Sequence, residues 1–178
     1  SSIDPVGWVD TESVTLSWEG AADAYSGLAQ MDYAIDGGEF VPLEVAETGS
    51  KEIDITALAD GEHTITLHLT DALGNSASWE HKFYVDVTPP QVELLTPPDG
   101  TVVTGVLDIW GNVTDISLLD WTLTATGSSG KVITVWTDTA EKTAEQLGVL
   151  DTGEFADGET IEIALVAHDQ AGHESTAR

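Results

Sequence analysis

The chain contains the same sequence pattern twice. Leu58–Glu62 (Leu-Ala-Asp-Gly-Glu) is matched by Phe155–Glu159 (Phe-Ala-Asp-Gly-Glu), and Asp71–Asn75 is matched by Asp169–His173. The matched aspartates are 97 and 98 residues apart. Because order and spacing persist together, the repeat predicts two copies of one structural module. The 178 residues are enough for two domains of about 90 residues each.

A pair of prolines separates the two copies. Val14–Trp18 in the first copy corresponds to Val106–Trp110 in the second, and Asp32–Asp36 corresponds to Asp120–Thr124. Between the copies lies Val85–Pro90, where two consecutive prolines favour an extended, semi-rigid connection. We therefore place the boundary at about residue 88, with one domain over residues 1–88 and the other over residues 89–178.

Apolar residues alternate with polar ones in both copies. Val14, Leu16 and Trp18 form one such series, and similar series run through 65–69 and 161–167. A period of two predicts half-buried antiparallel strands, and turn signals such as Asp60-Gly61 separate the series. The expected fold class is all-β, with two tandem antiparallel β-sandwiches and with Trp18 and Trp110 buried in separate cores.

Composition excludes several kinds of protein. The absence of cysteine excludes disulfides, thiolate zinc sites and cysteine nucleophiles. With 32 acidic residues against 5 lysines and arginines, the formal charge of −27 excludes nucleic acid as a main partner. No apolar run approaches the roughly 18 residues of a membrane helix, so membrane insertion is not expected. The acidity fits either a calcium-loaded, solvated surface at the cell exterior or a high-salt habitat.

Several segments carry a family resemblance. These are Val-Thr-Leu-Ser-Trp at Val14–Trp18, the Tyr33 strand, the Leu-x-Asp-Gly corner, and the Asp-x-x-Gly-Asn hairpin before a Phe-x-Val-Asp-x-Thr-Pro-Pro exit. Together they resemble the prokaryotic immunoglobulin-like or fibronectin type III-like tandem repeats of secreted and cell-surface proteins. In such a repeat Trp18 and Trp110 are core tryptophans, and His63 stands where many of these domains have a corner tyrosine.

The resemblance implies a function and a location. Such modules act as spacers, adhesive segments or accessory domains, outside the cell or on its surface. The expected partners are neighbouring modules of the same polypeptide, with cell-surface glycans or proteins as further candidates. No enzyme is predicted, because no Gly-x-Ser-x-Gly nucleophile motif occurs and carboxylates are too abundant for a pair of them to indicate a site.

Aspartates recur at matching places in the two modules. Each module has one five residues after the repeated tryptophan, one opening the loop of the later repeat, and one ahead of a proline. In an immunoglobulin-like topology these places meet at one pole, where clustered carboxylates favour a hard cation such as calcium. The predicted metal ligands are Asp86, Asp115 and Asp169 at the junction, and Asp4, Asp23 and Asp71 upstream. The alternative is that these aspartates cap turns.

Two other binding hypotheses remain open. His168 and His173 flank the later repeat loop, but two histidines without a third ligand favour a structural role over zinc binding. Trp8 and Trp136 are the tryptophans whose environment the pattern does not settle. An exposed indole stacks on pyranose rings, so exposure of either one would favour the alternative function, a carbohydrate-binding or accessory module of a secreted hydrolase.

The second copy has a shorter end than the first. Only nine residues follow Asp169, whereas the first copy continues from Asp71 through Trp79–Val85. We therefore expect the chain to be a fragment whose last strand is incomplete. The missing part is expected from residues beyond Arg178 or from another chain, because an unpaired edge exposes backbone and core.

Overall fold

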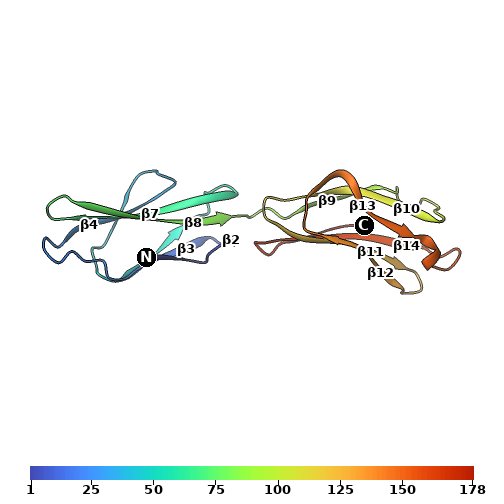
Figure 1. Cartoon of the computed structure of the whole chain (residues 1–178), viewed down its shortest axis with the longest axis horizontal. Helices are drawn as coiled ribbons and strands as arrows, with labels where there is room; N and C mark the ends of the chain where they lie inside the picture. Colours follow the sequence, from blue (N-terminus) through green and yellow to red (C-terminus); the bar gives the residue numbers. More distant parts are fainter. The chain divides into compact units, whose positions relative to one another are not determined.

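The computed structural model describes residues 1–178 and divides them into two compact units, Ser1–Val87 and Thr88–Arg178 (Figure 1). The regular structure is β throughout except for the 3-10 turn η1 (Thr152–Glu154), so the all-β prediction is confirmed. None of the chain's helical structure is long and apolar enough to cross a membrane.

Unit 1 contains two sheets. Its strands are β1 (Ser2–Asp4), β2 (Trp8–Val9), β3 (Ser13–Trp18), β4 (Leu28–Ile35), β5 (Val41–Leu43), β6 (Gly49–Asp54), β7 (Gly61–Asp71) and β8 (Ser76–Val85). One sheet has the order β1-β3-β6 and the other the order β2-β8-β7-β4-β5. All neighbours are antiparallel except β2 and β8, which are parallel.

Unit 2 repeats this arrangement with one strand fewer. Its strands are β9 (Gln91–Thr96), β10 (Val106–Thr114), β11 (Leu118–Gly127), β12 (Val132–Asp138), β13 (Lys142–Asp151), β14 (Ile161–Asp169) and β15 (Glu174–Ala177). One sheet has the order β13-β10-β9, and the other has the order β12-β11-β14-β15. Every neighbouring pair is antiparallel. Figure 1 shows β11 and β14 side by side within this unit.

The alternating pattern of unit 1 places its apolar residues in one core. Val14, Leu16 and Trp18 are buried at every second position of β3, as the period of two predicts. Residues 65, 67 and 69 of β7 are buried in the same way from the other sheet, and Phe83 and Val85 of β8 join them. Trp18 therefore lies in the core of unit 1, as expected.

The core of unit 2 differs from the prediction at one tryptophan. Trp110 is 42% exposed, so its predicted burial is wrong, while Trp121 of β11 is fully buried. The pairing of β10 with β13 changes register between Ile109 and Trp110. Buried Ile109, Gly111 and Val113 nevertheless alternate with less buried residues along β10, so Trp110 lies on the face of the strand opposite the core.

The strand registers also correct the predicted correspondence between copies. Leu28 pairs with Asp71 and Leu118 pairs with Asp169, so these two pairs occupy equivalent places. In the same ladders Met31 pairs with Leu69 and Trp121 pairs with Ala167. Trp121 thus corresponds to Met31, and the proposed match of Asp32–Asp36 with Asp120–Thr124 is two residues out of register.

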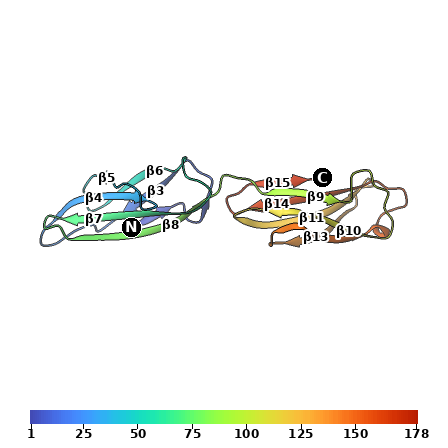
Figure 2. The same cartoon turned by 90° about the horizontal axis from the view of Figure 1, so that it is seen from above.

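The last strand has a different length in the two units. β8 spans 10 residues and pairs with β7 from Thr70 to Gly61, whereas β15 spans 4 residues. β15 pairs with β14 only at positions 165–168 (Figure 2). The first half of β14 therefore has a ladder partner on its β11 side alone.

Candidate functional site

Asp71 fixes the loop between β7 and β8. Its Oδ1 accepts hydrogen bonds from the backbone N–H groups of Leu73 (2.9 Å) and Asn75 (2.8 Å). Its Oδ2 accepts hydrogen bonds from Asn75 Nδ2 (2.7 Å) and Ser26 Oγ (2.7 Å). The side-chain bonds from Asn75 and Ser26, with the backbone bonds, lower the pKa of Asp71 to about 2. Four donors match the roughly four lone-pair sites of a carboxylate, so Asp71 is saturated.

Asp23 organises the loop between β3 and β4 in a similar way. Its Oδ1 accepts from the N–H groups of Ser26 (2.6 Å) and Tyr25 (2.9 Å), and it lies 2.8 Å from Ser26 Oγ, whose single proton is shared with Asp71 Oδ2. The backbone and side-chain bonds from Ser26, followed by the backbone bond from Tyr25, hold the pKa of Asp23 below its usual value. Because Ser26 Oγ also contacts Asp71, one serine joins the two loops.

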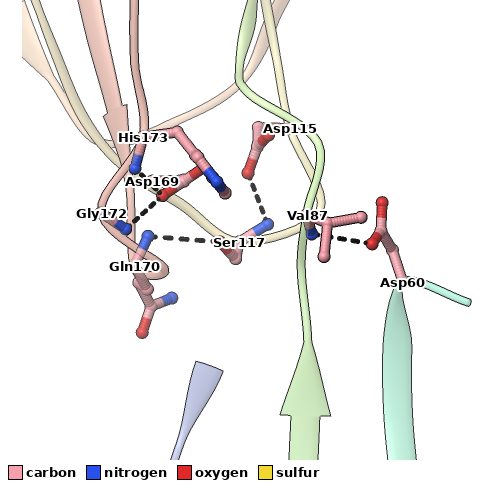
Figure 3. A network of polar contacts seen from close by, with 8 residues as sticks. All are labelled: Asp60, Val87, Asp115, Ser117, Asp169, Gln170, Gly172 and His173. Carbon is pink, nitrogen blue, oxygen red and sulfur yellow. Dashed lines mark hydrogen bonds and ion pairs between the residues drawn. The ribbon is translucent and has the colours of Figure 1, made fainter. Parts of the chain in front are cut away.

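Asp169 has the role of Asp71 in unit 2. Figure 3 shows its carboxylate directed at the N–H groups of Gly172 and His173, which donate to Oδ1 at 2.7 and 2.8 Å. Oδ2 lies 2.6 Å from Nδ1 of His173, which forms an ion pair with it when protonated. These contacts use three of the roughly four lone-pair sites of the carboxylate.

Asp115 shapes the neighbouring loop between β10 and β11. Its Oδ1 accepts from the N–H of Ser117 (2.7 Å), and its own N–H donates to Glu141 Oε1 (2.8 Å). The N–H of Gln170 in turn donates to the carbonyl oxygen (3.0 Å) and Oγ (3.2 Å) of Ser117 (Figure 3). A buried serine therefore joins the two aspartate loops in unit 2 as well.

The other two predicted ligands lie outside these loops. Asp4 is the last residue of β1 and pairs with Thr15, about 10 Å along β3 from Trp18. It corresponds to Thr96, the last residue of β9, because each is followed by a proline. The assumed equivalence of Asp4 with Asp86 is therefore wrong. Asp86 follows β8, and its N–H donates to the carbonyl of Val9 (3.0 Å).

A hydrogen bond fixes the backbone where unit 1 ends. The N–H of Val87 donates to Asp60 Oδ1 at 2.9 Å (Figure 3). Asp60 belongs to the Leu-x-Asp-Gly corner that the sequence repeats at Asp157. This aspartate thus holds the outgoing chain against the corner before Pro89 and Pro90.

The donor sets differ in how well they suit a cation. In unit 1, Asp71 is saturated by protein donors and Asp4 lies on β1 outside the two loops, which leaves Asp23 as the loop aspartate of the upstream set with capacity for a further ligand. In unit 2, Asp169 keeps lone-pair capacity, and its loop is tied to that of Asp115. Carboxylate oxygens are ligands that calcium accepts. The residues of unit 2 fit such an ion better than those of unit 1.

His63 links Asp36 to Ala59 at the position expected for a corner tyrosine, and this pair of contacts is called the His63 clip. Its Nδ1 lies 2.7 Å from Asp36 Oδ2, and its Nε2 lies 2.7 Å from the carbonyl oxygen of Ala59. Both partners are acceptors, so the ring fits best when both nitrogens carry protons. Burial lowers the pKa of His63, but the bonds to Asp36 and Ala59 outweigh it and leave the pKa raised.

The two histidines considered for zinc have separate carboxylate partners. His168 Nδ1 lies 2.9 Å from Asp120 Oδ1, and its Nε2 lies 3.2 Å from Glu174 Oε2. The bond to Asp120 raises the pKa of His168, burial opposes the rise, and the bond to Glu174 adds to it. His173 contacts Asp169 instead. Both histidines therefore have carboxylate partners within unit 2.

Exposed tryptophans occur in both units. Trp136 is 54% exposed, whereas Trp8 is half-buried with its ring centroid 5.0 Å from that of Tyr84. Trp79 in unit 1 is also exposed. The exposed Trp110 lies on β10 between two polar pairs. Gln146 Nε2 donates to Asp108 Oδ1 (2.8 Å), and Asn112 Nδ2 donates to Glu93 Oε2 (2.7 Å).

The two serines that join the loops were not predicted from the sequence. Ser26 follows Asp23 by three residues, and Ser117 follows Asp115 by two. An aspartate with a serine two or three residues later is a typical signature of a side-chain-capped turn, which could have identified both. Their contacts with Asp71 and Gln170 could not have been identified in this way, because those partners are 45 and 53 residues away.

The comparisons with known proteins give structural similarities only. No protein-family model matches the chain, and no curated protein sequence matches it. A crystal structure of a tetra-tandem repeat in the extending region of a large adhesion protein is similar at 24% identity and a TM-score of 0.46. That match covers 93% of this chain and 44% of the other, so the chain spans less than half of that structure.

Two further structures share less sequence. One is a carbohydrate-binding module of the β-sandwich superfamily, with 14% identity, a TM-score of 0.41, and coverage of 98% of this chain and 92% of the other. The other is dimeric latent PorU from Porphyromonas gingivalis, with 15% identity and a TM-score of 0.32. It is matched over 97% of this chain and 18% of its own length.

Proposed function

We propose that the chain is a pair of immunoglobulin-like β-sandwich modules with a non-catalytic role, spacing or presenting other parts of an extracellular or cell-surface polypeptide. One observation carries the proposal: in both units a serine ties two aspartate-capped loops together at the same end of the fold. Such bonds reduce the flexibility of these loops, and loops are where binding sites are common. Rigid loops suit a module whose role is to hold neighbouring parts of a polypeptide at a fixed spacing.

Single-molecule stretching of the full chain tests this proposal. Two independent modules of 87 and 91 residues should unfold in two separate steps. Each step should lengthen the chain by about 25–30 nm, given the extended length per residue. Extension without discrete steps would contradict a spacing role, since a spacer has to resist force. A protein with Trp121→Ala serves as the control, because only the step of unit 2 should weaken.

We also propose calcium binding where the chain enters unit 2. Asp115 and Asp169 are the ligands from this unit, and Asp86 is the ligand from the preceding segment. Gln91 pairs with Thr114, so the incoming strand β9 begins beside the Asp115 loop, which supports the proposal. A bound ion supplies a divalent positive charge to a chain of formal charge −27.

Native mass spectrometry before and after a chelator measures the ion content directly. The expected result is one calcium per chain, lost with Asp115→Asn or Asp169→Asn and kept with Asp157→Asn, which changes an exposed aspartate of another loop. A chain that retains no calcium at millimolar concentration contradicts this part of the proposal. Turn capping would then account for all four loop aspartates.

Carbohydrate binding is a second candidate function, favoured by Trp110 and Trp136. An exposed indole on a strand, with hydrogen-bonding side chains beside it, matches what a pyranose ring requires. The test is titration of the chain with a soluble β-1,4-linked glucose hexasaccharide, followed by tryptophan fluorescence. Binding should be lost with Trp110→Ala and kept with Trp79→Ala, which removes an exposed tryptophan of unit 1. An unchanged spectrum with this and other hexasaccharides removes the candidate.

A further inference from the structure

Trp110 is an exposed indole in the middle of a sheet face. β10 lies between β9 and β13, and Figure 1 shows these three strands in one layer of unit 2. Residues of β10 alternate between the core and the outer face, so Trp110 faces outward together with Asp108 and Asn112. At Trp110 the backbone of β10 is paired on both sides, so no further strand can add to it. A ligand of this face therefore contacts side chains.

A bulge lies beside Trp110 in each neighbouring strand. On β13 the extra residue is Leu147, and Gln146 stands opposite Trp110. On β9 the extra residue is Leu95, and Thr96 stands opposite Trp110. A regular strand would place the leucine opposite the indole in each case. The two bulges thus give the indole polar neighbours on both sides, and bulges that redirect side chains are frequent beside functional sites.

The corresponding sheet of unit 1 has neither feature. β3 pairs with β1 and with β6 without a register shift. Its outward-facing residues are Ser13, Thr15 and Ser17, and Thr15 has the place of Trp110 because β1 and β9 pair alike with the two strands. This sheet therefore forms without an exposed aromatic residue and without bulges, so folding alone does not account for the outer face of unit 2.

Two hydrogen-bonded pairs flank the indole along β10. Gln146 Nε2 donates to Asp108 Oδ1 (2.8 Å), and Asn112 Nδ2 donates to Glu93 Oε2 (2.7 Å). The N–H of Ala144 also donates to Asn112 Oδ1 at 2.6 Å. The backbone positions of Asp108 and Asn112 are about 13 Å apart along the strand, with the indole between them in one row. Side chains that are already ordered lose little freedom when a ligand binds.

Each pair can both donate and accept further hydrogen bonds. An amide nitrogen has two N–H groups and uses one of them within the pair, and a carboxylate has about four lone-pair sites. A sugar hydroxyl likewise donates and accepts, and the apolar face of a pyranose ring stacks on an indole. A cation would need acceptors only, so the amide donors favour a ligand rich in hydroxyls.

The charges of this face exclude acidic ligands. A carboxylate lies on each side of the indole, and both carboxylates repel an anion. The lysines and the arginine of unit 2 form ion pairs with carboxylates outside the two polar pairs, and they are Lys131, Lys142 and Arg178. Uncharged sugars meet no such repulsion. Because the indole and the two pairs lie in one row, the ligand that fits them is a linear chain of sugars.

We propose that this face of unit 2 binds an uncharged, linear glycan. One sugar ring stacks on Trp110, and the rings on either side of it are hydrogen-bonded by the pairs Asp108–Gln146 and Glu93–Asn112. The site rests on carbohydrate binding as the function of the chain, and it adds which face binds, which side chains fix the ligand and which glycans are excluded. Because unit 1 has a threonine at this place, the site belongs to unit 2 alone.

Titration of the isotope-labelled full chain with soluble hexasaccharides tests the ligand class. The uncharged probes are β-1,4-linked glucose, mannose and N-acetylglucosamine, and the anionic probe is α-1,4-linked galacturonate. At least one uncharged probe should bind at least tenfold more tightly than galacturonate, with amide shifts at 93, 108–112 and 146. If no uncharged probe causes shifts up to about 1 mM, this site and carbohydrate binding are both overturned. If galacturonate binds as tightly, carbohydrate binding stands and the proposed ligand class is overturned.

Matched tryptophan variants locate the site. Trp110→Ala should abolish binding, whereas Trp136→Ala and Trp79→Ala, which remove other exposed indoles, should keep it. The opposite result would leave carbohydrate binding in place and overturn this site. A tetra-arginine peptide that shifts the same residues when no hexasaccharide does would identify a cation site, which also overturns the proposal.

Variants of the two exposed carboxylates separate charge from hydrogen bonding. Asp108→Asn combined with Glu93→Gln should bind the uncharged probe within about threefold of wild type, and its preference over galacturonate should fall below tenfold. Replacing both residues by alanine should weaken the uncharged probe at least tenfold. Unchanged affinity in the alanine variant would show that the pairs do not contact the ligand and would overturn the proposed arrangement.

Discussion

The two units place a tryptophan in the core from opposite sheets. In unit 1 the indole comes from Trp18 on β3, and its Nε1 donates to the carbonyl of Ala46 (3.1 Å). In unit 2 it comes from Trp121 on β11, and its Nε1 donates to the carbonyl of Ala140 (2.9 Å). The carbonyl of Ala46 lies in the loop between β5 and β6, and the carbonyl of Ala140 lies in the loop between β12 and β13. In each unit this loop connects one sheet to the other. Both units therefore have a hydrogen bond from a core indole to a loop carbonyl, but the strand that carries the tryptophan differs.

This difference shows which property of the core is the same in both units. At the position of Trp121, unit 1 has Met31, whose sulfur accepts from the N–H of Ala46 at 3.4 Å. Trp18 fills the remaining space from the other sheet, next to Gly49. Filled volume and a satisfied indole N–H are therefore common to the two cores, while the strand that supplies the ring is free to change.

Removing each tryptophan in turn tests this comparison with the largest expected effect. Trp18→Ala and Trp121→Ala should each destabilise their own unit by about 3–5 kcal/mol, because each leaves a cavity and an unbonded carbonyl. Trp110→Ala should change stability by less than about 0.5 kcal/mol. Hydrogen exchange read by mass spectrometry assigns the loss to a unit. A large loss of stability from Trp110→Ala would instead support the prediction from the sequence that Trp110 lies in the core.

The second largest effect on stability is expected from a substitution at Gly49, because Trp18 covers this residue. A Cβ added at this position would lie 2.6 Å from Cζ2 of Trp18, so one of the two groups has to move. Gly49→Ala should destabilise unit 1 by about 1–3 kcal/mol, as overpacking does, and leave unit 2 unchanged. Chemical denaturation of the full chain and of Thr48→Ala, an exposed neighbour, provides the measurement and its control. Equal stability of the two variants would show that the indole moves freely.

Asp71 and Asp169 have the same place but different partners. The pKa of Asp71 in the folded chain, about 2, is below its ordinary value of 3.8. Its stabilising effect is therefore complete above pH 3.8 and is lost as the pH falls through about 2. Asp71→Asn should lower the melting temperature of unit 1 by several degrees at pH 7, and this deficit should disappear near pH 2. A deficit independent of pH would mean that loop shape, and not charge, is responsible.

The smallest expected effect concerns the clip at His63. Its pKa is raised in the folded chain, so its contribution is complete below the ordinary pKa of 6.5 and is lost as the pH rises through the raised value. Wild-type unit 1 should thus lose about one to three degrees of melting temperature between pH 6 and pH 9. Asp36→Asn should remove this dependence, whereas Asp157→Asn should keep it. An identical pH profile in both variants would contradict the clip.

The sequence predicted the strands well because burial on one face is a local property. Val14, Leu16 and Trp18 alternate in the sequence, and they alternate in burial. The prediction for Trp110 was wrong because the two copies were aligned by their tryptophans, whereas Thr96 pairs with Trp110 as Asp4 pairs with Thr15, so Trp110 corresponds to Thr15 and not to Trp18. The period of two formed by Leu107, Ile109 and Val113 would have placed Trp110 on the opposite face.

The aspartate loops were predicted in part. Asp71 and Asp169 do occupy matching loops, and so do Asp23 and Asp115, because repeated spacing places them there. Asp4 was misplaced, because the distance of an aspartate from a proline does not reveal whether it lies in a strand or in a linker. Leu73 and Asn75 are near Asp71 in the sequence, but its fourth donor, Ser26, is 45 residues away, so the sequence alone could not show that Asp71 is saturated.

The opposite origin of the two core indoles also affects folding of the chain. Neighbouring modules of similar sequence can exchange equivalent strands while they fold, and such hybrids are characteristic errors of repeat proteins. Replacing β10 with β3 would bring Trp18 into a core that already contains Trp121, and the reverse exchange would leave a core with no indole. One hybrid is overfilled and the other is hollow. The two modules can therefore remain alike in topology without being interchangeable, which favours correct pairing of each strand with its own unit.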